Sequence, residues 1–435
     1  MTNLFARYSL ALLCAFGISL IFSLLSYFLT CQPNAPLVFD LYSGFGELTE
    51  QLVKHHSYQS ANSFWTAHRM PFVPFFLAFL ALFSHQSLFA LIIKNMLFFS
   101  LTAIAILNVT KHTTEKKHNV IILFFVAYLC CFPHYMLYAT MVDYEEGYLI
   151  HLFALLFIGL SFFNEPQKLP STFRCCLFAV TNTIIYLTKS SMLPSSLFMC
   201  LAFFLRFNRS KKVFGIMIGV LLFGIVGWGT TNLVNSGTFS ISSSWNGENF
   251  YKGNNKYALS FYPKNNLDNL HALKLLVLPE SYDNEWQANR ALADKALTYL
   301  KKNPADAIKL LLKKTWVCFF DIRKLPIHYI IEDKNYKSAS NPLINRVSAF
   351  GMLLFRLLFF LSLYHTVVNF RLWITKKKYT QIIITLCFWG WVIMYTLPYI
   401  VGFVYTRHVV PLIIPTFYYA LYLFTNTNHR IKNNI

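Results

Sequence analysis

The sequence predicts an all-α polytopic membrane protein with about ten transmembrane helices, an interfacial helix region on the outer face and one long, partly helical outer loop. Of the 435 residues, 56% are hydrophobic and only 13% are charged, whereas an average soluble protein has about 25% charged residues. Apolar runs of roughly 20 residues recur along the chain, the length that a helix needs to cross a bilayer. Many of the lysines and arginines lie in short segments between these runs, as the positive-inside rule expects of cytoplasmic loops.

The net charge of +20 would suggest nucleic-acid binding in a soluble protein. Here the positive-inside bias explains most of it, and an acidic headgroup or a phosphate substrate can account for some of the rest. The nine cysteines show no metal-ligand spacing. The chain has no P-loop, no G-x-S-x-G, no H-E-x-x-H and no Rossmann glycine pattern. ATP-driven pumps, serine hydrolases and zinc proteases of the usual kinds are therefore excluded.

The first part of the chain, residues 1–233, is expected to form a transmembrane module that includes the first outer loop, 31–85. Residues 8–30 are long enough to span a bilayer and lack a clear signal-peptide cleavage site. Arg7 precedes this run, which places the N-terminus in the cytoplasm. We therefore expect an uncleaved first span that leads into an outer loop.

The second span follows from the charges on both sides of it. The segment 111–118, KHTTEKKH, contains three lysines and should be cytoplasmic. Only one crossing then fits between Arg69 and this segment. Residues 71–83 should therefore lie on the outer face or dip into it, and residues 86–109 should form the second span.

The same reasoning gives the remaining crossings. Residues 346–435 should form the C-terminal transmembrane helices, with the C-terminus in the cytoplasm. All 18 acidic residues except Glu115 and Glu165 then fall on the outer side, which supports the topology modestly. The other spans of the first module are expected at 119–139, at 148–163, on both sides of an outer turn at 188–194, and at 213–233.

The long outer loop, 234–345, is expected to contain two helices. Residues 285–302 have apolar side chains at helical spacing. Asn303 and Pro304 then suit the N-cap and the first position of a second helix, 305–320. That helix has an amphipathic pattern that suits the outer membrane surface. Its apolar residues are Ile308, Leu311 and Leu312, and its lysines are Lys309, Lys313 and Lys314.

Asp40 is the main candidate for a catalytic residue. It lies in the stretch 37–74, the first after the opening apolar run that is too rich in ionisable groups for lipid. A carboxylate near a membrane exit can accept a proton from an acceptor hydroxyl or amine as a general base. No metal is needed if the leaving group is already activated, as a lipid phosphate is. The alternative is a helix N-cap in an ordinary solvated loop.

A second group of acids consists of Asp143, Glu145 and Glu146. Such carboxylates can bind a divalent cation through oxygen ligands or position an acceptor. They are equally typical of the first turn of a helix, where the helix dipole stabilises them. A divalent cation is the one cofactor that the sequence leaves open.

Three cations and one loop complete the candidates. Lys189 lies in a tight outer turn and can either hold a lipid phosphate or extend to the headgroups. Lys94 falls within an apolar run, where a charge is costly unless it has a partner. Arg407 opens the last span, where it can pair with a phosphate or with Asp40, or anchor in the headgroups. The loop 242–262 is rich in Gly, Asn and aromatic residues, which can stack on a sugar ring and bind its hydroxyls.

Together these features resemble the bacterial membrane-embedded glycosyltransferases of the GT-C class, near the family 39 enzymes, which include protein mannosyltransferases and relatives of lipid A aminoarabinose transferase. In that family an acid follows the first span, as Asp40 does in FDLYSGFGEL. Leu41 stands where many relatives have a second acid, and no large C-terminal domain follows. The other matching elements are Arg69-Met70-Pro71 with Pro74, Ser243 to Gly247, Gly253-Asn254-Asn255, Asn303-Pro304, and Thr406 to Pro411.

The resemblance implies an inverting transfer of a sugar from a polyprenyl-phosphate donor to an envelope acceptor, on the periplasmic face of the inner membrane. Asp40 would be the general base, and Lys189 and Arg407 would be candidates for the donor phosphate. The 242–262 loop would shape the sugar site. The substrate-binding candidates are Arg69, Lys189, Asn246, Asn254, Asn255 and Arg407.

Other functions remain open on the sequence. A transporter or lipid flippase would need polar residues near mid-membrane, often in paired repeats, and this chain has few. An O-antigen ligase or polymerase would share the many spans and the large outer loop. The missing second acid at Leu41 also leaves room for a non-catalytic relative.

Overall fold

The computed structural model describes residues 16–17, 19–21, 23–24, 37–40, 44–60, 66–110, 144–162, 171–207, 209–262, 282–321, 342–404 and 406–427. Most of the expected first span, all of the span expected at 119–139, and Asp143 lie outside these residues. Only the backbone of Asp40 and Arg407 is described.

The prediction of an all-helical protein is confirmed for the described residues. Their only β-type pairing is one isolated antiparallel bridge, between Leu37 and Gln86. The helices are η1 (Val38–Asp40), α2 (Phe45–His55), α3 (Phe72–Ala81), α4 (Ser87–Thr110), α7 (Glu146–Phe162), α8 (Thr172–Thr188), η2 (Ser190–Met192), α9 (Leu193–Arg206), α10 (Lys211–Ser236), α11 (Asn246–Gly253), α12 (Ala258–Phe261), α14 (Glu285–Lys302), α15 (Pro304–Phe319), α16 (Pro342–Thr375), α17 (Tyr379–Val401), η4 (Thr406–Leu412) and α18 (Ile413–Thr427).

Among the described residues, three stretches are long and apolar enough to cross a membrane. They are Lys211–Ser236, Ala349–Thr375 and Gln381–Val401, which correspond to α10 and to most of α16 and α17. Shorter apolar segments, of 10–17 residues, lie in α3, α4, α7, α8, α9 and α18. The separation of α3 from α4 agrees with the expectation that residues 71–83 and 86–109 form distinct elements.

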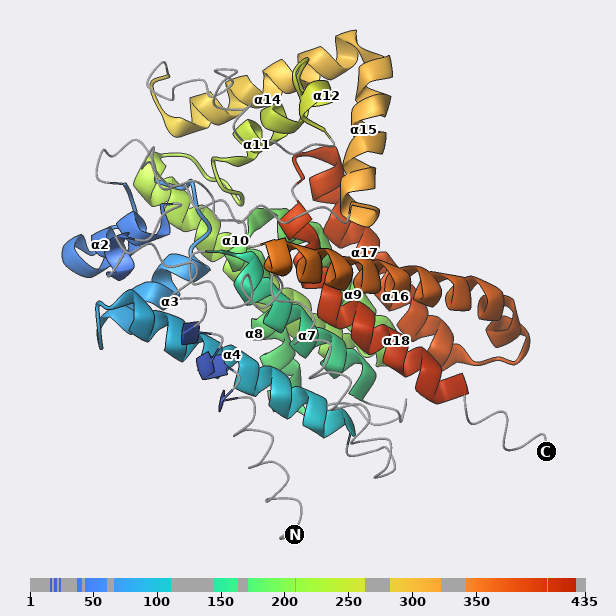
Figure 1. The fold of residues 1–435 in the computed structure, drawn as a ribbon. Coiled ribbons are helices and arrows are strands. Elements are labelled where there is room, and N and C mark those ends of the chain that lie inside the picture. The colour runs from blue at the N-terminus through green and yellow to red at the C-terminus, as the bar shows by residue number, and fades with distance from the viewer. Residues whose placement is uncertain are drawn as a thin grey trace.

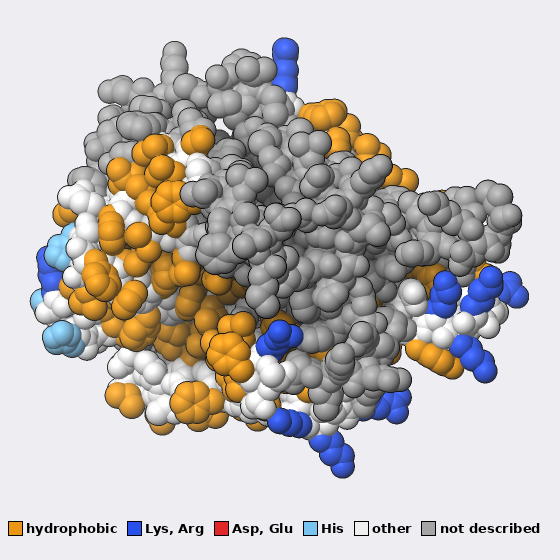
Figure 2. Space-filling model, turned by 90° about the horizontal axis from the view of Figure 1, so that it is seen from below, with side chains coloured by type: hydrophobic (Ala, Val, Ile, Leu, Met, Phe, Trp, Pro, Cys, Tyr) orange, Lys and Arg blue, Asp and Glu red, His pale blue; other side chains and the backbone are white. Residues whose placement is uncertain are grey.

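The apolar helices form one bundle, in which α7 and α8 lie centrally between α4 on one side and α16 to α18 on the other (Figure 1). Aromatic rings fill its core. The ring of Trp391 lies 4.6 Å from Phe157 and 4.9 Å from Phe153, and Phe388 stacks on Tyr419 at 4.1 Å. Seen from below, the described surface carries hydrophobic, Lys, Arg and His side chains, and no described Asp or Glu comes into view (Figure 2).

Helices α11, α12 and α14 cover the opposite end of the bundle, and α15 runs down from the end of α14 toward α17 (Figure 1). The bounds of α14 coincide with the predicted 285–302, and α15 begins at Pro304 as expected. Asn303 occupies the N-cap position of α15, but its side chain makes no capping bond. Instead its Nδ2 donates to the Tyr299 carbonyl oxygen at 2.9 Å and so closes the end of α14.

Lys314, which the sequence places with the lysines on the polar face of α15, is buried together with Leu310 and Val317. Ile308 and Leu312, on the expected apolar face, are 60% and 64% exposed. Lys314 turns inward because its ammonium has three acceptors there. It donates to Asn254 Oδ1 at 2.9 Å, to the Val401 carbonyl oxygen at 2.9 Å and to the Gly402 carbonyl oxygen at 3.0 Å.

Candidate functional site

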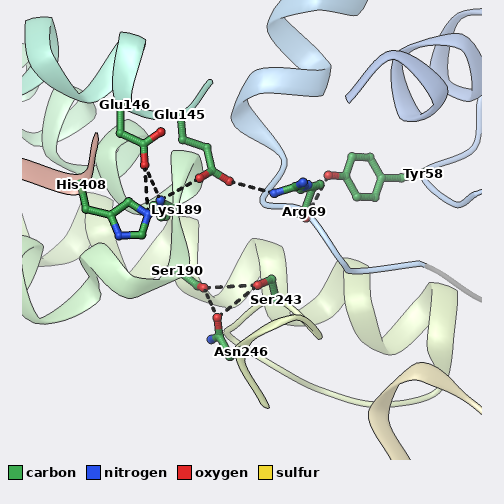
Figure 3. A network of polar contacts seen from close by, with 9 residues as sticks. All are labelled: Tyr58, Arg69, Glu145, Glu146, Lys189, Ser190, Ser243, Asn246 and His408. Carbon is green, nitrogen blue, oxygen red and sulfur yellow. Dashed lines mark hydrogen bonds and ion pairs between the residues drawn. The ribbon is translucent and has the colours of Figure 1, made fainter. Parts of the chain in front are cut away.

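The main candidate site is a buried cluster of acids and cations near the start of α7. The Lys189 ammonium nitrogen lies 2.9 Å from Glu145 Oε2 and 2.8 Å from Glu146 Oε1. On one side Arg69 Nη1 lies 3.6 Å from Glu145 Oε1, and on the other His408 Nε2 lies 3.6 Å from Glu146 Oε1 (Figure 3). Four segments that are distant in sequence therefore meet here.

The local backbone explains why the central residues meet. Glu146 is the first residue of α7, and Glu145 precedes it, so both carboxylates lie at the positive end of a helix dipole. Lys189 is the C-cap of α8, at the negative end of its dipole, and its extended backbone breaks the helix before η2. The structural interpretation of the acids as helix N-terminal residues is therefore compatible with a role in the site.

The cluster is shielded from water. The side chains of Lys189, Glu145 and Glu146 are 17%, 14% and 2% exposed. Burial disfavours the charged ammonium, but the two carboxylates outweigh that effect and hold the pKa of Lys189 well above its usual value. Lys189 is therefore a permanent cation at neutral pH, and the acids depend on it for compensation.

A group of neutral polar side chains lies directly beside the ion pairs. Ser190 Oγ donates to Asn246 Oδ1 at 3.1 Å, and Ser243 Oγ donates to the same oxygen at 3.3 Å. Figure 3 shows this group next to Lys189, which precedes Ser190 in the chain. Hydroxyl and amide groups at this position can exchange hydrogen bonds with the hydroxyls of a sugar.

Aromatic rings hold Arg69 in place. Its guanidinium carbon lies 4.1 Å from the Trp245 ring centre and 4.9 Å from the Phe45 ring centre. Its backbone oxygen accepts a hydrogen bond from the Tyr58 hydroxyl at 3.0 Å. A stacked guanidinium keeps its planar donor edge available, so Arg69 is presented toward Glu145 in a fixed orientation.

Glu285 is a structural component of the site that sequence reasoning missed, because it was interpreted only as the first residue of a helix. The carboxylate is 1% exposed. It accepts hydrogen bonds from Thr66 N at 2.9 Å, from the Thr66 hydroxyl, from Ala67 N at 3.2 Å and from Ser244 Oγ at 2.5 Å. Glu285 thereby joins the segments that carry Arg69 and Asn246.

Asn254 and Asn255 lie in the scaffold of the loop rather than in the ion-pair cluster. The Asn254 amide donates to the Val401 carbonyl oxygen at 2.9 Å and accepts from Lys314. Asn255 Oδ1 accepts from Tyr257 N at 2.8 Å and from Ala258 N at 3.1 Å, at the start of α12. Both amides are engaged in holding α11, α12 and α15 together.

The segment that contains Asp40 belongs to the same end of the bundle. Its helix η1 is fixed by a hydrogen bond from Val38 N to the His85 carbonyl oxygen at 2.8 Å. Gly44, with a φ of +77°, allows the chain to turn closely against His68, since a Cβ there would lie 2.6 Å from His68 Nε2. Gly44 is therefore held close to the segment that carries Arg69, and Asp40 precedes Gly44 by four residues.

Two further predicted cations have identifiable surroundings. Arg407 lies in η4, next to His408 of the cluster. Lys94 is fully buried in α4, and its ammonium lies 4.9 Å from the Tyr148 ring centre. A cation over an aromatic face regains part of the electrostatic stabilisation lost on leaving water.

No group of three or more His, Cys, Asp or Glu side chains that could hold a metal occurs among the described residues. Asp143, the third acid of the predicted cation site, lies outside them. The two acids that are described, Glu145 and Glu146, are already compensated by Lys189.

Acid is expected to destabilise the protein through His68. Burial and the neighbouring Arg69 charge lower the pKa of His68 to about 3, from 6.5 in the unfolded chain. Above pH 6.5 neither state binds this proton; below it only the unfolded state does, so stability should fall by about 1.4 kcal/mol per pH unit until pH 3. The free energy of unfolding, measured in detergent across this pH range, should fall less steeply for His68→Gln than for wild type. The exposed His55→Gln should behave as wild type, and equal slopes in all three proteins would contradict the prediction.

No protein-family model, curated protein or solved structure matches this chain.

Proposed function

We propose that the chain is a multi-pass inner-membrane glycosyltransferase with about ten spans, cytoplasmic termini and a periplasmic active site. It would move a sugar from a polyprenyl-phosphate donor to an envelope acceptor with inversion at the anomeric carbon. The observation that carries the proposal is the juxtaposition of Arg69, Lys189 and the neutral group Ser190, Ser243 and Asn246 at one end of an apolar bundle. Cations for a phosphate and hydrogen-bonding groups for a sugar lie side by side there.

The distances support different proposed roles for the two cations. Lys189 makes two close contacts with carboxylates, at 2.8 and 2.9 Å, whereas Arg69 makes one longer contact with Glu145, at 3.6 Å. The ion pair of Arg69 with Glu145 is therefore the weaker one, and in this proposal the planar guanidinium would turn to a donor phosphate and bind it through two parallel hydrogen bonds. Lys189 would fix the two acids and add positive potential behind them.

The reaction needs one general base. An acceptor hydroxyl or amine would attack the anomeric carbon from the side opposite the phosphate. The bond from that carbon to the phosphate oxygen would break, and polyprenyl phosphate would leave with the bonding electron pair. The acceptor proton would pass to Asp40, whose carboxylate is the base in this proposal.

The test is an in vitro transfer assay with purified wild-type protein and Asp40→Asn. The donors are labelled polyprenyl-phosphate sugars, and the acceptor is a total envelope lipid extract. Loss of the base is expected to lower the transfer rate by about 10²–10⁴-fold. The exposed Asp294→Asn is the matched control and should keep wild-type activity. Arg69→Lys should mainly raise the KM for the donor, since a lysine retains the charge without the two-point contact.

Two outcomes would contradict the proposal. Equal activity in wild type and Asp40→Asn would remove Asp40 from the mechanism and direct attention to Asp143 and Glu145. Absence of transfer by the folded wild-type protein from every donor, with acceptor present, would favour a flippase or a non-catalytic protein.

A further inference from the structure

We infer that α15 enters the bilayer end-on, so that its apolar face passes from the headgroup level at Ile308 to the phospholipid acyl chains at Leu312, Trp316 and Phe320. These residues recur every four positions and are 60%, 64%, 54% and 45% exposed, so they form one continuous apolar stripe along the helix. The bilayer leaflet concerned is the one next to α14, which the proposed topology makes the outer one.

The stripe continues into the surface of a candidate span. Trp316 stacks on Phe320 at 4.9 Å, and Phe320 stacks on Phe360 of α16 at 5.2 Å. Beside them α16 exposes Leu357 and Leu361, each just over half accessible. An apolar surface that continues without interruption into a membrane-facing surface is expected to contact the same lipid chains.

Contacts with α17 give the depth of α15. Lys314 binds the carbonyl oxygens of Val401 and Gly402, at the end of α17. Further along, the Phe319 ring lies 5.6 Å from Phe359, whose ring lies 5.2 Å from Trp389. Phe359 lies inside the candidate span of α16. The C-terminal end of α15 therefore reaches the level of the spanning segments, and Figure 1 shows α15 running down to the bundle.

The buried Arg356 is an independent indication of this depth. It lies inside the candidate span of α16, is 4% exposed, and its Nη2 donates to the Asp321 carbonyl oxygen at 3.4 Å. A helix that ends within a bilayer leaves carbonyl groups and a negative dipole end that water cannot compensate. A guanidinium beside the carbonyl of Asp321, just after the end of α15, supplies part of that compensation.

The opposite end of α15 is suited to the headgroup region. Lys309 is largely exposed, and so are Lys301 and Lys302 in the last turn of α14. Lysines at this level can contact lipid phosphates while the stripe below them contacts acyl chains. The distribution of charge along α15 therefore runs from headgroup to hydrocarbon, which a helix lying flat on the surface would not require.

The depth can be measured with single introduced cysteines in protein reconstituted into phosphatidylethanolamine and phosphatidylglycerol vesicles. Ile308→Cys, Leu312→Cys and Phe320→Cys are compared with Leu297→Cys, an exposed apolar position on α14. A membrane-impermeant maleimide is added from outside to vesicles with α14 outward, and peptide mass spectrometry locates the label, so the native cysteines can remain.

End-on insertion predicts a gradient along one face. Ile308→Cys should react nearly as fast as Leu297→Cys, and Phe320→Cys at least about ten-fold more slowly, since a thiol in hydrocarbon neither ionises nor meets the reagent. All sites should react after solubilisation in dodecyl sulfate. Equal protection at 308 and 320 would indicate a flat helix, and equal rapid labelling would indicate a water-facing stripe; either result would overturn the inference.

Coverage of the stripe by a second copy of the chain would also protect Phe320→Cys, so a second measurement is needed. A benzophenone amino acid in place of Trp316 should cross-link to phospholipid on irradiation. A cross-linked product of twice the chain mass would overturn the inference. Neither measurement depends on the proposed transferase activity.

Discussion

Replacing Lys189 by methionine is expected to destabilise the folded protein by about 3–5 kcal/mol and to abolish the proposed transfer activity. The substitution keeps most of the side-chain volume but removes the cation that lies within 3 Å of both Glu145 and Glu146. Two buried carboxylates would then remain without their main counter-charge, and breaking a buried ion pair from one side has about this cost. Denaturant unfolding in detergent, together with the transfer assay, measures both effects.

Lys309→Met is the matched control. Lys309 also pairs with an acid, Asp306, but at 3.6 Å and with 64% of its side chain exposed. Such a surface pair contributes about 0–1 kcal/mol. If Lys189→Met lost no more stability than Lys309→Met, the cluster would not hold this part of the bundle together.

A second substitution separates charge from packing. Glu146→Gln in the Lys189→Met background removes one uncompensated carboxylate, so the double variant should be more stable than Lys189→Met alone. Non-additivity of this kind is what a direct pair produces in a double-mutant cycle.

Gly253→Ala is expected to lower stability by about 3 kcal/mol, near the upper end of the usual cost of overpacking. A Cβ at this position would lie 1.9 Å from the Gly402 carbonyl oxygen and 3.1 Å from Phe403 Cα. Both atoms belong to the backbone, so no flexible side chain can move aside. The expected consequence is the separation of α11 from the end of α17, seen as earlier unfolding and as cleavage near α11 in limited proteolysis.

Gly219→Ala is the control for a glycine substitution in a helix. Nothing lies within 4 Å of a Cβ placed there. Since alanine favours a helix over glycine by up to about 1 kcal/mol, this variant should be as stable as wild type or slightly more stable. If Gly253→Ala and Gly219→Ala had the same effect on stability, α11 would not pack against Gly402 in the folded protein.

Much of the architecture could be predicted from local patterns. The bounds of α14 followed from apolar spacing, and the position of α10 followed from its apolar length. The burial of Lys314 in α15 did not, because its acceptors lie at the ends of α11 and α17. Those acceptors are contributed by segments distant in sequence, and periodicity within a helix carries no information about them.

In the candidate site, too, the sequence predicts some features and not others. Lys189, Glu145 and Glu146 could be selected because charged groups beside apolar runs need partners, whereas Arg69 and Asn246 became candidates through the family resemblance. Their pairing depends on which helix ends meet, so the sequence could not give it. Ser190, Ser243 and Glu285 resemble ordinary loop or helix-start residues, and only their contacts distinguish them.

The position of His408 has a consequence for biosynthesis. Arg69, Glu145, Glu146 and Lys189 all belong to the first half of the chain, so a nascent protein can bring these charges together while the ribosome is still translating the rest. The last segments contribute His408 to the cluster and Gly402 to the surface against which α11 packs. Since chains fold from the N-terminus during synthesis, the ion pairs can form first and be enclosed only when the final segment inserts.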